Sequence, residues 1–188
     1  MDGAYFDIEE LCLQCEELRF YSEHFHFRLM QRVNRLADMC GRLPEDDEIY
    51  FIETQKSFSA FAFVAYVLQF AGRIDELYIA TYSTNERIIN AILRWKDRGL
   101  IGSVSIRISE TIKFRMPQVW KRLQQLHDEG AISLSVEWSH KKVACMKTPL
   151  GCYVVEGSGN YGENSLSEQY VFLRSEEVYL FRKKQDYG

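Results

Sequence analysis

Several features that would mark a membrane, secreted or nucleotide-binding protein are missing from this 188-residue chain. It has no apolar run approaching the length of a membrane span, and no signal-peptide pattern follows Met1. The Gly-rich phosphate loop of nucleotide-binding proteins is also missing, because Gly157-Ser158-Gly159 lacks the Gly-Lys-Ser/Thr sequence that opens the next helix. With five cysteines, an odd number, and no secretion signal, the sequence predicts reduced thiols in a cytoplasmic protein.

The composition is that of a chain with a full hydrophobic core. Apolar residues make up 46% of the sequence and aromatic residues 14%, which is typical of a packed interior rather than of disorder. The net charge of −4 is unevenly distributed, with 11 basic and 17 acidic side chains in residues 1–101 and 12 basic and 10 acidic in residues 102–188. The C-terminal part is therefore the more basic one, and a local basic cleft there can still bind a polyanion.

Strand-like and helical patterns alternate through the middle of the sequence. Strands are predicted at residues 49–53, 77–82, 103–108 and 132–138, and helices at residues 58–70, after Ser83 or Thr84, and from Pro117 onward. Such short strand–helix units imply right-handed crossovers and a mainly parallel sheet covered on both faces. A closing hairpin of strands 143–146 and 152–155, followed by a strand at 169–173, makes the sheet mixed. We therefore expect an α/β/α sandwich with a mixed, largely parallel sheet over residues 46–188.

Residues 1–45 read as a helical extension of that domain. One apolar stripe at helical spacing comprises Ile8, Leu11, Cys12, Cys15 and Leu18, and a second comprises Phe25, Leu29, Val33, Leu36 and Cys40. Together they predict an N-terminal helical hairpin that packs on the domain, on a second copy or on another protein. The cysteines and the nearby His24 and His26 are also zinc-ligand types. Because Cys12 and Cys15 fall on the apolar stripe, where a free thiol behaves as a small hydrophobe, we expect no metal and no other cofactor.

Side chains that can carry chemistry are concentrated between residues 140 and 168. They supply an imidazole, an ammonium, a hydroxyl, an amide and a carboxylate, from His140, Lys142, Ser158, Asn160 and Glu168. Because successive side chains of a strand point to opposite faces, His140 and Lys142 should project together while Lys141 turns away. Gly157 and Gly159 allow a ligand to approach closely, so that Ser158 and Asn160 can reach the same side of the sheet.

This set of groups can hold a phosphate diester and attack it without a metal ion. His140, titrating near neutral pH, can act as nucleophile or as acid. Lys142 can neutralise the developing charge, with Ser158 and Asn160 donating hydrogen bonds. Glu168 can orient an imidazole and stabilise it when it is protonated. A single imidazole cannot easily attack phosphorus and protonate the leaving oxygen in one in-line displacement.

The same segment resembles the HKD motif of the phospholipase D-like superfamily, whose pattern is H-x-K-x4-D-x6-G-S-x-N followed by an acidic residue. The sequence matches this pattern at six positions, with Glu168 as the acidic partner: His140, Lys142, Gly157, Ser158, Asn160 and Glu168. It departs at two points. Lys147 stands where the motif has its aspartate, and the link before Gly157 is about three residues longer than in the pattern.

The resemblance implies an α/β/α sandwich and a metal-independent phosphodiesterase in which two HKD motifs meet at one site. Since this chain has a single motif, we expect a homodimer that joins two copies across a twofold axis. The small single-motif form, and the lack of a membrane-binding amphipathic segment, favour a nuclease over a lipase. Gly157, Gly159 and Lys147 are then expected to contact the nucleic acid substrate.

Other interpretations of the same residues remain open. The fold could carry a catalytically disabled site and bind nucleic acid or a protein partner, in keeping with the replacement of the motif aspartate by Lys147. Activity is expected if Lys147 points away from the face of His140, and the binding module is favoured if its charge fills the site. Lys147 could also be an ordinary edge charge, and residues 157–160 a plain tight turn. A phospholipid-cleaving enzyme is a third possibility and predicts an exposed apolar rim.

Overall fold

A nine-stranded mixed sheet runs through the part of the chain that the computed structural model describes, namely residues 18–23, 27–31, 36–46, 48–54, 58–162 and 167–187. The strands are Leu18–Glu23 (β1), Phe27–Gln31 (β2), Ile49–Thr54 (β3), Ile74–Thr81 (β4), Ile101–Ser109 (β5), Ser133–Glu137 (β6), Val143–Thr148 (β7), Gly151–Gly157 (β8) and Glu168–Arg174 (β9). The helices are Leu36–Cys40 (α2), Phe61–Ala71 (α3), Glu86–Asp97 (α4), Ile112–Arg115 (α5), Pro117–Asp128 (α6) and Glu176–Tyr187 (α7). None of these helices is long and apolar enough to cross a membrane.

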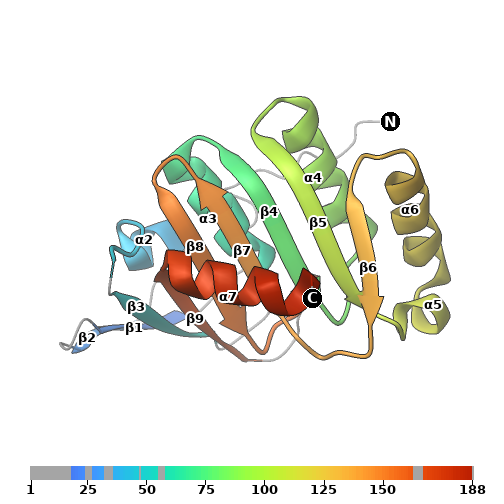
Figure 1. The fold of residues 1–188 in the computed structure, drawn as a ribbon. Coiled ribbons are helices and arrows are strands. Elements are labelled where there is room, and N and C mark those ends of the chain that lie inside the picture. The colour runs from blue at the N-terminus through green and yellow to red at the C-terminus, as the bar shows by residue number, and fades with distance from the viewer. Residues whose placement is uncertain are drawn as a thin grey trace, which may run out of the picture.

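The order of the strands is β2-β1-β3-β9-β8-β7-β4-β5-β6, with helices on both faces (Figure 1). The α/β/α sandwich with a mixed sheet is therefore confirmed. The expectation of a largely parallel sheet is wrong, because two neighbouring pairs are parallel and six are antiparallel. The reason lies in the crossover from β3 to β4, which leaves room for β7, β8 and β9 between them. Strands joined by short turns pair antiparallel, so this insertion makes the centre of the sheet antiparallel.

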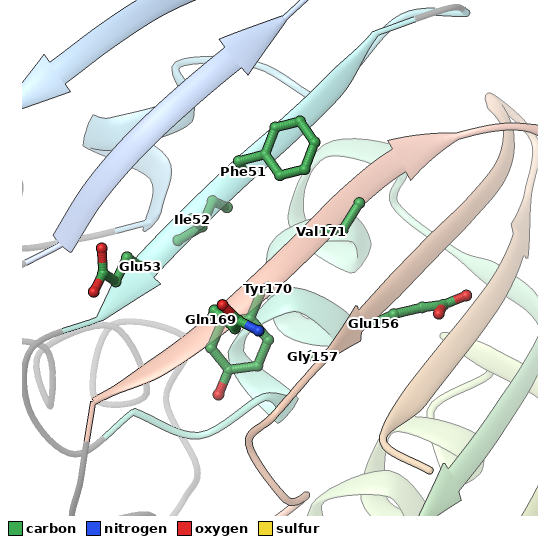
Figure 2. A pocket seen from close by; sticks show the side chains of 8 residues that line it. All are labelled: Phe51, Ile52, Glu53, Glu156, Gly157, Gln169, Tyr170 and Val171. Atoms are coloured by element: carbon green, nitrogen blue, oxygen red, sulfur yellow. The ribbon is translucent and has the colours of Figure 1, made fainter.

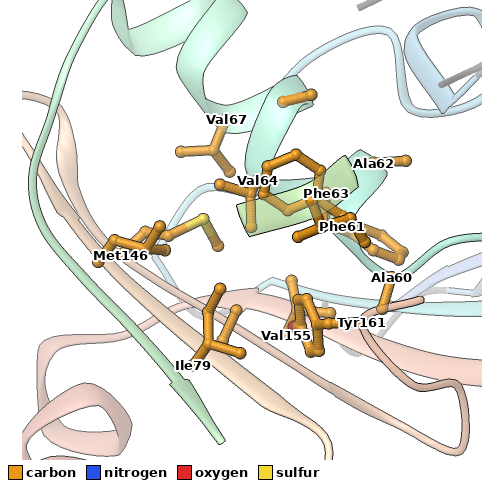
Figure 3. Packing of buried hydrophobic residues seen from close by; sticks show 14 of the residues in the cluster. Ala60, Phe61, Ala62, Phe63, Val64, Val67, Ile79, Met146, Val155 and Tyr161 are labelled. Carbon is orange, nitrogen blue, oxygen red and sulfur yellow. The ribbon is translucent and has the colours of Figure 1, made fainter. Parts of the chain in front are cut away.

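The main core lies between the sheet and helices α3, α4 and α6. Residues 61–68 of α3 are all buried, as expected for a helix that is apolar nearly all round. Figure 3 shows Val64 and Val67 of α3 facing Ile79 and Met146 of the sheet. Each large apolar side chain buried in this way stabilises the fold by roughly 1.5–3 kcal/mol.

Helix α7 covers part of the opposite face of the sheet, over β7 and β8 (Figure 1). Tyr179 is buried there in a second apolar cluster, with Tyr78, Cys145 and Val154 among its members. Two ion pairs fasten the helix to the sheet, Arg182 with Glu156 and Lys183 with Glu76. The sequence patterns had predicted no element after residue 173.

Residues 18–23 and 27–31 form a β-hairpin, which corrects the helical structure predicted there as part of the helical hairpin over residues 1–45. β1 and β2 pair antiparallel, with Tyr21 opposite Leu29, so the second predicted helix is wrong over residues 27–31. Among the described residues before β3, the short α2 is the only helix. β1 also pairs with all six residues of β3, and this satisfies an edge whose backbone groups would otherwise lack partners. That tertiary pairing overrides the local helical spacing. Of the first predicted helix, Ile8, Leu11, Cys12 and Cys15 lie outside the described residues, and Leu18 begins β1 instead.

The loops that carry residues of the sequence motif lie together at one edge of the sheet. Because β4, β5 and β6 are parallel, and β8 runs in the same direction, the carboxyl ends of these four strands meet there. The amino-terminal ends of β7 and β9 lie at the same edge. Loops at the carboxyl ends of parallel strands are where ligands bind in open α/β sheets.

Candidate functional site

His140 and Lys142 lie in the connection between β6 and β7 rather than within a strand. The sequence had predicted alternating strand positions for them, but β7 begins only at Val143. The physical reason is topological. β7 pairs with the far side of β4, so the chain must pass the ends of β5 and β4 after leaving β6. Residues 138–142 make that passage along the edge of the sheet.

Tyr82, the first residue after β4, is the centre around which these side chains gather. The imidazole of His140 stacks on its ring, with the ring centroids 4.4 Å apart and the planes inclined by 22°. The Lys142 ammonium lies 5.7 Å from the centroid of the same ring, and its Nζ donates a 2.7 Å hydrogen bond to the backbone oxygen of His140. The Arg115 guanidinium lies 5.2 Å from the centroid, and its Nη1 donates to the Tyr82 hydroxyl at 2.5 Å.

The surroundings of Tyr82 favour negative charge. Hydrogen bonds from the Thr111 and Arg115 side chains lower the pKa of Tyr82, and the charge of Lys142 contributes in the same direction. A field that stabilises a phenolate also stabilises a phosphate oxygen. Sequence reasoning missed Tyr82 and Arg115. Their positions just after β4 and within α5, at the carboxyl ends of two predicted strands, were the signal that could have identified them.

Ser158 and Glu168 are brought together by the start of β9. The Ser158 hydroxyl donates a short hydrogen bond to Glu168 Oε2 and accepts one from the Gln169 backbone N–H at 3.0 Å. Thr54 Oγ1 accepts a 3.0 Å hydrogen bond from the Glu168 N–H, which fixes the backbone of the acidic residue. Glu168 had been expected to orient an imidazole. In the structure its carboxylate contacts Ser158, and His140 stacks on Tyr82.

The Gly157 turn joins these two groups of residues. The Gly157 N–H donates to the backbone oxygen of Lys142 at 3.1 Å, so the Ser158 turn lies directly beside Lys142. A Cβ atom at residue 157 would be 2.3 Å from the Gln169 backbone oxygen, and close strand approach therefore requires glycine. Beyond the buried Gly159, the chain passes through Asn160 toward the end of β4, where the Tyr161 N–H donates to Thr81 Oγ1 at 3.3 Å.

Lys147 is not brought to this group of residues. It lies near the opposite end of β7, five residues beyond Lys142, or about 16 Å along an extended strand. Its Nζ is 3.5 Å from Glu76 Oε1, and the same carboxylate accepts hydrogen bonds from Lys183 and from Tyr179. Lys183 lowers the pKa of Glu76 more than any other neighbour does. The charge of Lys147 is thus engaged on the face covered by α7.

A pocket of about 410 Å³ lies next to Gly157, on the face of β3, β9 and β8 (Figure 2). Its lining is largely apolar and includes two carboxylates; the residues are Phe51, Ile52, Glu53, Glu156, Gly157, Gln169, Tyr170 and Val171. A carboxylate repels a phosphate, and the basic groups described above lie at the edge of the sheet. The edge around Tyr82, rather than this pocket, therefore has the electrostatics that a phosphate diester needs.

Within the described residues, no group of three or more His, Cys, Asp or Glu side chains is arranged to hold a metal ion. Of the residues with zinc-ligand chemistry, Cys12, Cys15, His24 and His26 lie outside the part of the chain that the structure describes. Cys40 is buried in the main core, and burial raises the pKa of its thiol. A buried thiol with a raised pKa behaves as an apolar side chain.

Comparison with known proteins identifies the fold. No protein-family model and no curated sequence matches the chain. Among solved structures, polyphosphate kinase from Porphyromonas gingivalis matches with a TM-score of 0.55 at 15% identity, over 73% of this chain and 25% of that protein. TrmBL2, an archaeal chromatin protein, matches with a TM-score of 0.48 at 12% identity, over 70% of this chain and 50% of that one. Phosphatidylserine synthase from Haemophilus influenzae Rd KW20 matches with a TM-score of 0.44 at 10% identity, over 85% of this chain and 40% of that protein.

The chain thus corresponds to a quarter to a half of the length of these proteins. At such low identity the match to polyphosphate kinase shows a shared fold alone. The α/β/α sandwich that the HKD resemblance implied is confirmed by the structure. The activity implied by that resemblance stays a prediction.

Proposed function

We propose that this protein is a metal-independent phosphodiesterase of the phospholipase D type that cleaves nucleic acid, with His140 as its nucleophile. One observation carries the proposal: His140 and Lys142 share a sheet edge with the Ser158–Glu168 pair, and the Gly157–Lys142 backbone bond joins the two. A fold held in common with a polyphosphate kinase, an enzyme of phosphate chemistry, supports phosphoryl transfer.

The reaction proceeds in two displacements at phosphorus. The neutral imidazole of His140 attacks the diester, forming a nitrogen–phosphorus bond while the bond to the leaving oxygen breaks. Lys142 and Arg115 neutralise the charge on the phosphoryl oxygens, and Ser158 and Asn160 contribute hydrogen bonds. Water then attacks phosphorus and the nitrogen–phosphorus bond breaks, which releases the phosphate monoester and regenerates the imidazole of His140. The proton lost by the water returns to the imidazole that protonated the leaving oxygen in the first displacement.

Protonation of the leaving oxygen requires a second acid, and a second copy of the chain supplies it. In this proposal two copies meet across a twofold axis, and His140 of one copy donates a proton while His140 of the other attacks. The negative charge of Glu168, whose carboxylate contacts Ser158, contributes to the stabilisation of an imidazolium at the same edge of the sheet. The exposure of the His140 side chain at the sheet edge supports this arrangement, because a partner can reach it.

The alternative is a disabled module of the same fold that binds nucleic acid or a protein partner. Lys147 in place of the motif aspartate is the feature that suggests it. The ion pair of Lys147 with Glu76 supports the enzyme instead, because the lysine charge is engaged under α7 and leaves the His140 edge unobstructed.

The proposal is tested by hydrolysis of bis(p-nitrophenyl) phosphate and of single-stranded DNA in EDTA. Wild type should turn over both substrates, and His140→Ala should lose at least the 10²–10⁴-fold typical of a removed acid–base or nucleophilic group. His127→Ala is the matched control, since His127 lies at the end of α6, with its Nδ1 3.3 Å from the backbone oxygen of Ile132. Equal turnover by His140→Ala and wild type would remove the site assignment.

Dimerisation is tested by subunit mixing. If each site needs two His140 side chains, an equilibrated equal mixture of wild type and His140→Ala should retain about a quarter of the wild-type activity at equal total protein, by random pairing. A monomer with a self-sufficient site would retain half. Sedimentation at micromolar concentration should show a dimer, and a strict monomer would contradict the two-histidine mechanism.

A further inference from the structure

Two aromatic side chains at the candidate site are largely exposed to solvent. Phe114 is 83% exposed and Trp138 is 77% exposed, more than any other large apolar side chain in the described part of the chain. Two large aromatic side chains exposed at one edge of the sheet offer apolar surface that a ligand can remove from water. Both residues lie on the edge that carries His140 and Tyr82.

Their backbones are held in place beside the reacting groups. Trp138 follows β6 directly and stands two residues before His140. Phe114 belongs to α5 and adjoins Arg115, the residue that contacts Tyr82. The Glu110 N–H donates to the backbone oxygen of Glu137 at 2.9 Å, which ties the segment leading into α5 to the end of β6.

Basic side chains flank Phe114 directly, and two more follow Trp138 at residues 141 and 142. Residues 110–115 and 137–142 contain four basic and two acidic side chains: Lys113, Arg115, Lys141 and Lys142, with Glu110 and Glu137. Lys113 pairs with Glu110 at 2.9 Å and Lys141 with Glu137 at 3.3 Å, while Arg115 and Lys142 converge on Tyr82. The surface is therefore positive in balance, with its excess beside His140.

We propose that Phe114 and Trp138 stack the unpaired bases of a single-stranded nucleic acid whose phosphates lie along Lys113, Arg115, Lys141 and Lys142. Every base presents a π face, so aromatic stacking combined with a basic track binds single strands with little sequence preference. A duplex hides those faces between its base pairs and loses this contribution. The inference deepens the proposed function, on which it rests for its role in catalysis, by assigning single strands as the substrate class.

Binding is measured without turnover in the full-length His140→Ala protein. The probe is a fluorescein-labelled oligodeoxythymidylate, followed by fluorescence anisotropy. Adding Phe114→Ala or Trp138→Ala should raise Kd about tenfold each, the usual effect of removing one stacked base contact. Adding Phe181→Ala is the matched control, since Phe181 is an exposed aromatic on α7 (52% exposed), and it should leave Kd unchanged. The same probe annealed to its complement should bind more weakly than the single strand.

Several results would overturn the inference. These are unchanged Kd values for both site variants, an equal loss with Phe181→Ala, or a duplex bound as tightly as the single strand. Failure of the inference can be told apart from failure of the proposed function. If wild type hydrolyses bis(p-nitrophenyl) phosphate but oligonucleotide binding does not depend on Phe114 and Trp138, the proposed enzyme activity stands and the proposed stacking surface is refuted. If binding depends on Phe114 and Trp138 but wild type hydrolyses no substrate, the stacking surface stands and the proposed enzyme activity is refuted.

Discussion

The imidazole of His140 lies nearly flat on the ring of Tyr82, with their centroids 4.4 Å apart. An aromatic stack restricts the rotation of the histidine ring, which a proposed nucleophile needs if its nitrogen is to face phosphorus. Tyr82 is thus a positioning residue, held in turn by Arg115 at its hydroxyl.

Tyr82→Ala should therefore lower kcat about tenfold or more while KM changes little, because the misplaced imidazole reacts more slowly. Tyr82→Phe retains the ring and should keep most of the activity. The kcat and KM values for bis(p-nitrophenyl) phosphate check both variants. Equal losses in the two would assign the effect to the hydroxyl and not to the stack.

Removal of Lys147 should be tolerated. Its partner Glu76 is also bound by Lys183, and the Lys147 side chain is half exposed, so Lys147→Ala should cost less than about 1 kcal/mol of unfolding free energy. Its turnover should match that of wild type. Lys142→Ala is the comparison and should lose about 10²-fold in kcat, as expected for a lost charge-stabilising group. A similar loss in Lys147→Ala would contradict the positions assigned to the two lysines.

A methyl group at residue 157 should destabilise the fold. The added Cβ would lie 2.3 Å from the Gln169 backbone oxygen and 2.4 Å from Tyr170 Cδ1, so β8 and β9 would have to separate. Overpacking of this kind costs about 1–3 kcal/mol. Gly162→Ala is the control, because its Cβ would meet only Asn85 Nδ2 at 3.9 Å. Urea unfolding of the two variants should show the difference, and equal midpoints would contradict it.

Acid should weaken the attachment of the segment before β3. Arg42 donates hydrogen bonds of 2.6 and 2.7 Å to the Glu48 carboxylate and lowers the pKa of Glu48 to about 2. Since the folded-state pKa is depressed, this stabilisation is present above the unfolded value, near 4.3, and is lost as the pH falls toward 2. Glu48→Gln should lose about 1–2 kcal/mol at pH 7, and its deficit should shrink as the pH falls through that window. A deficit that is independent of pH would contradict the assignment.

The local elements of the fold could be predicted from the sequence because their signals are local. Pro117 opens α6 as expected, and strand 103–108 corresponds to β5. The helix predicted over residues 27–31 is wrong because these residues pair with β1, which itself pairs with the edge of β3. No local pattern carries that information.

The candidate site could be predicted in its residue types more than in its geometry. The Ser158–Glu168 contact joins two segments of one hairpin region, and the predicted strands brought them close. The stack of His140 on Tyr82 depends on the order β7-β4-β5-β6, which forces residues 138–142 across the ends of β5 and β4. The alternation of side chains expected for a strand, extended from β7 back to His140, does not indicate that residues 138–142 pass the ends of other strands.

Trapping the covalent intermediate tests the role of His140 as nucleophile most directly. Wild type mixed with bis(p-nitrophenyl) phosphate in EDTA is quenched within the first turnover, digested at neutral to alkaline pH and examined by mass spectrometry. If His140 is the nucleophile, its peptide should carry a p-nitrophenyl phosphoryl group, and the His140→Ala variant should carry no such adduct. Turnover with the phosphoryl group on another residue, or with undiminished activity in His140→Ala, would contradict it.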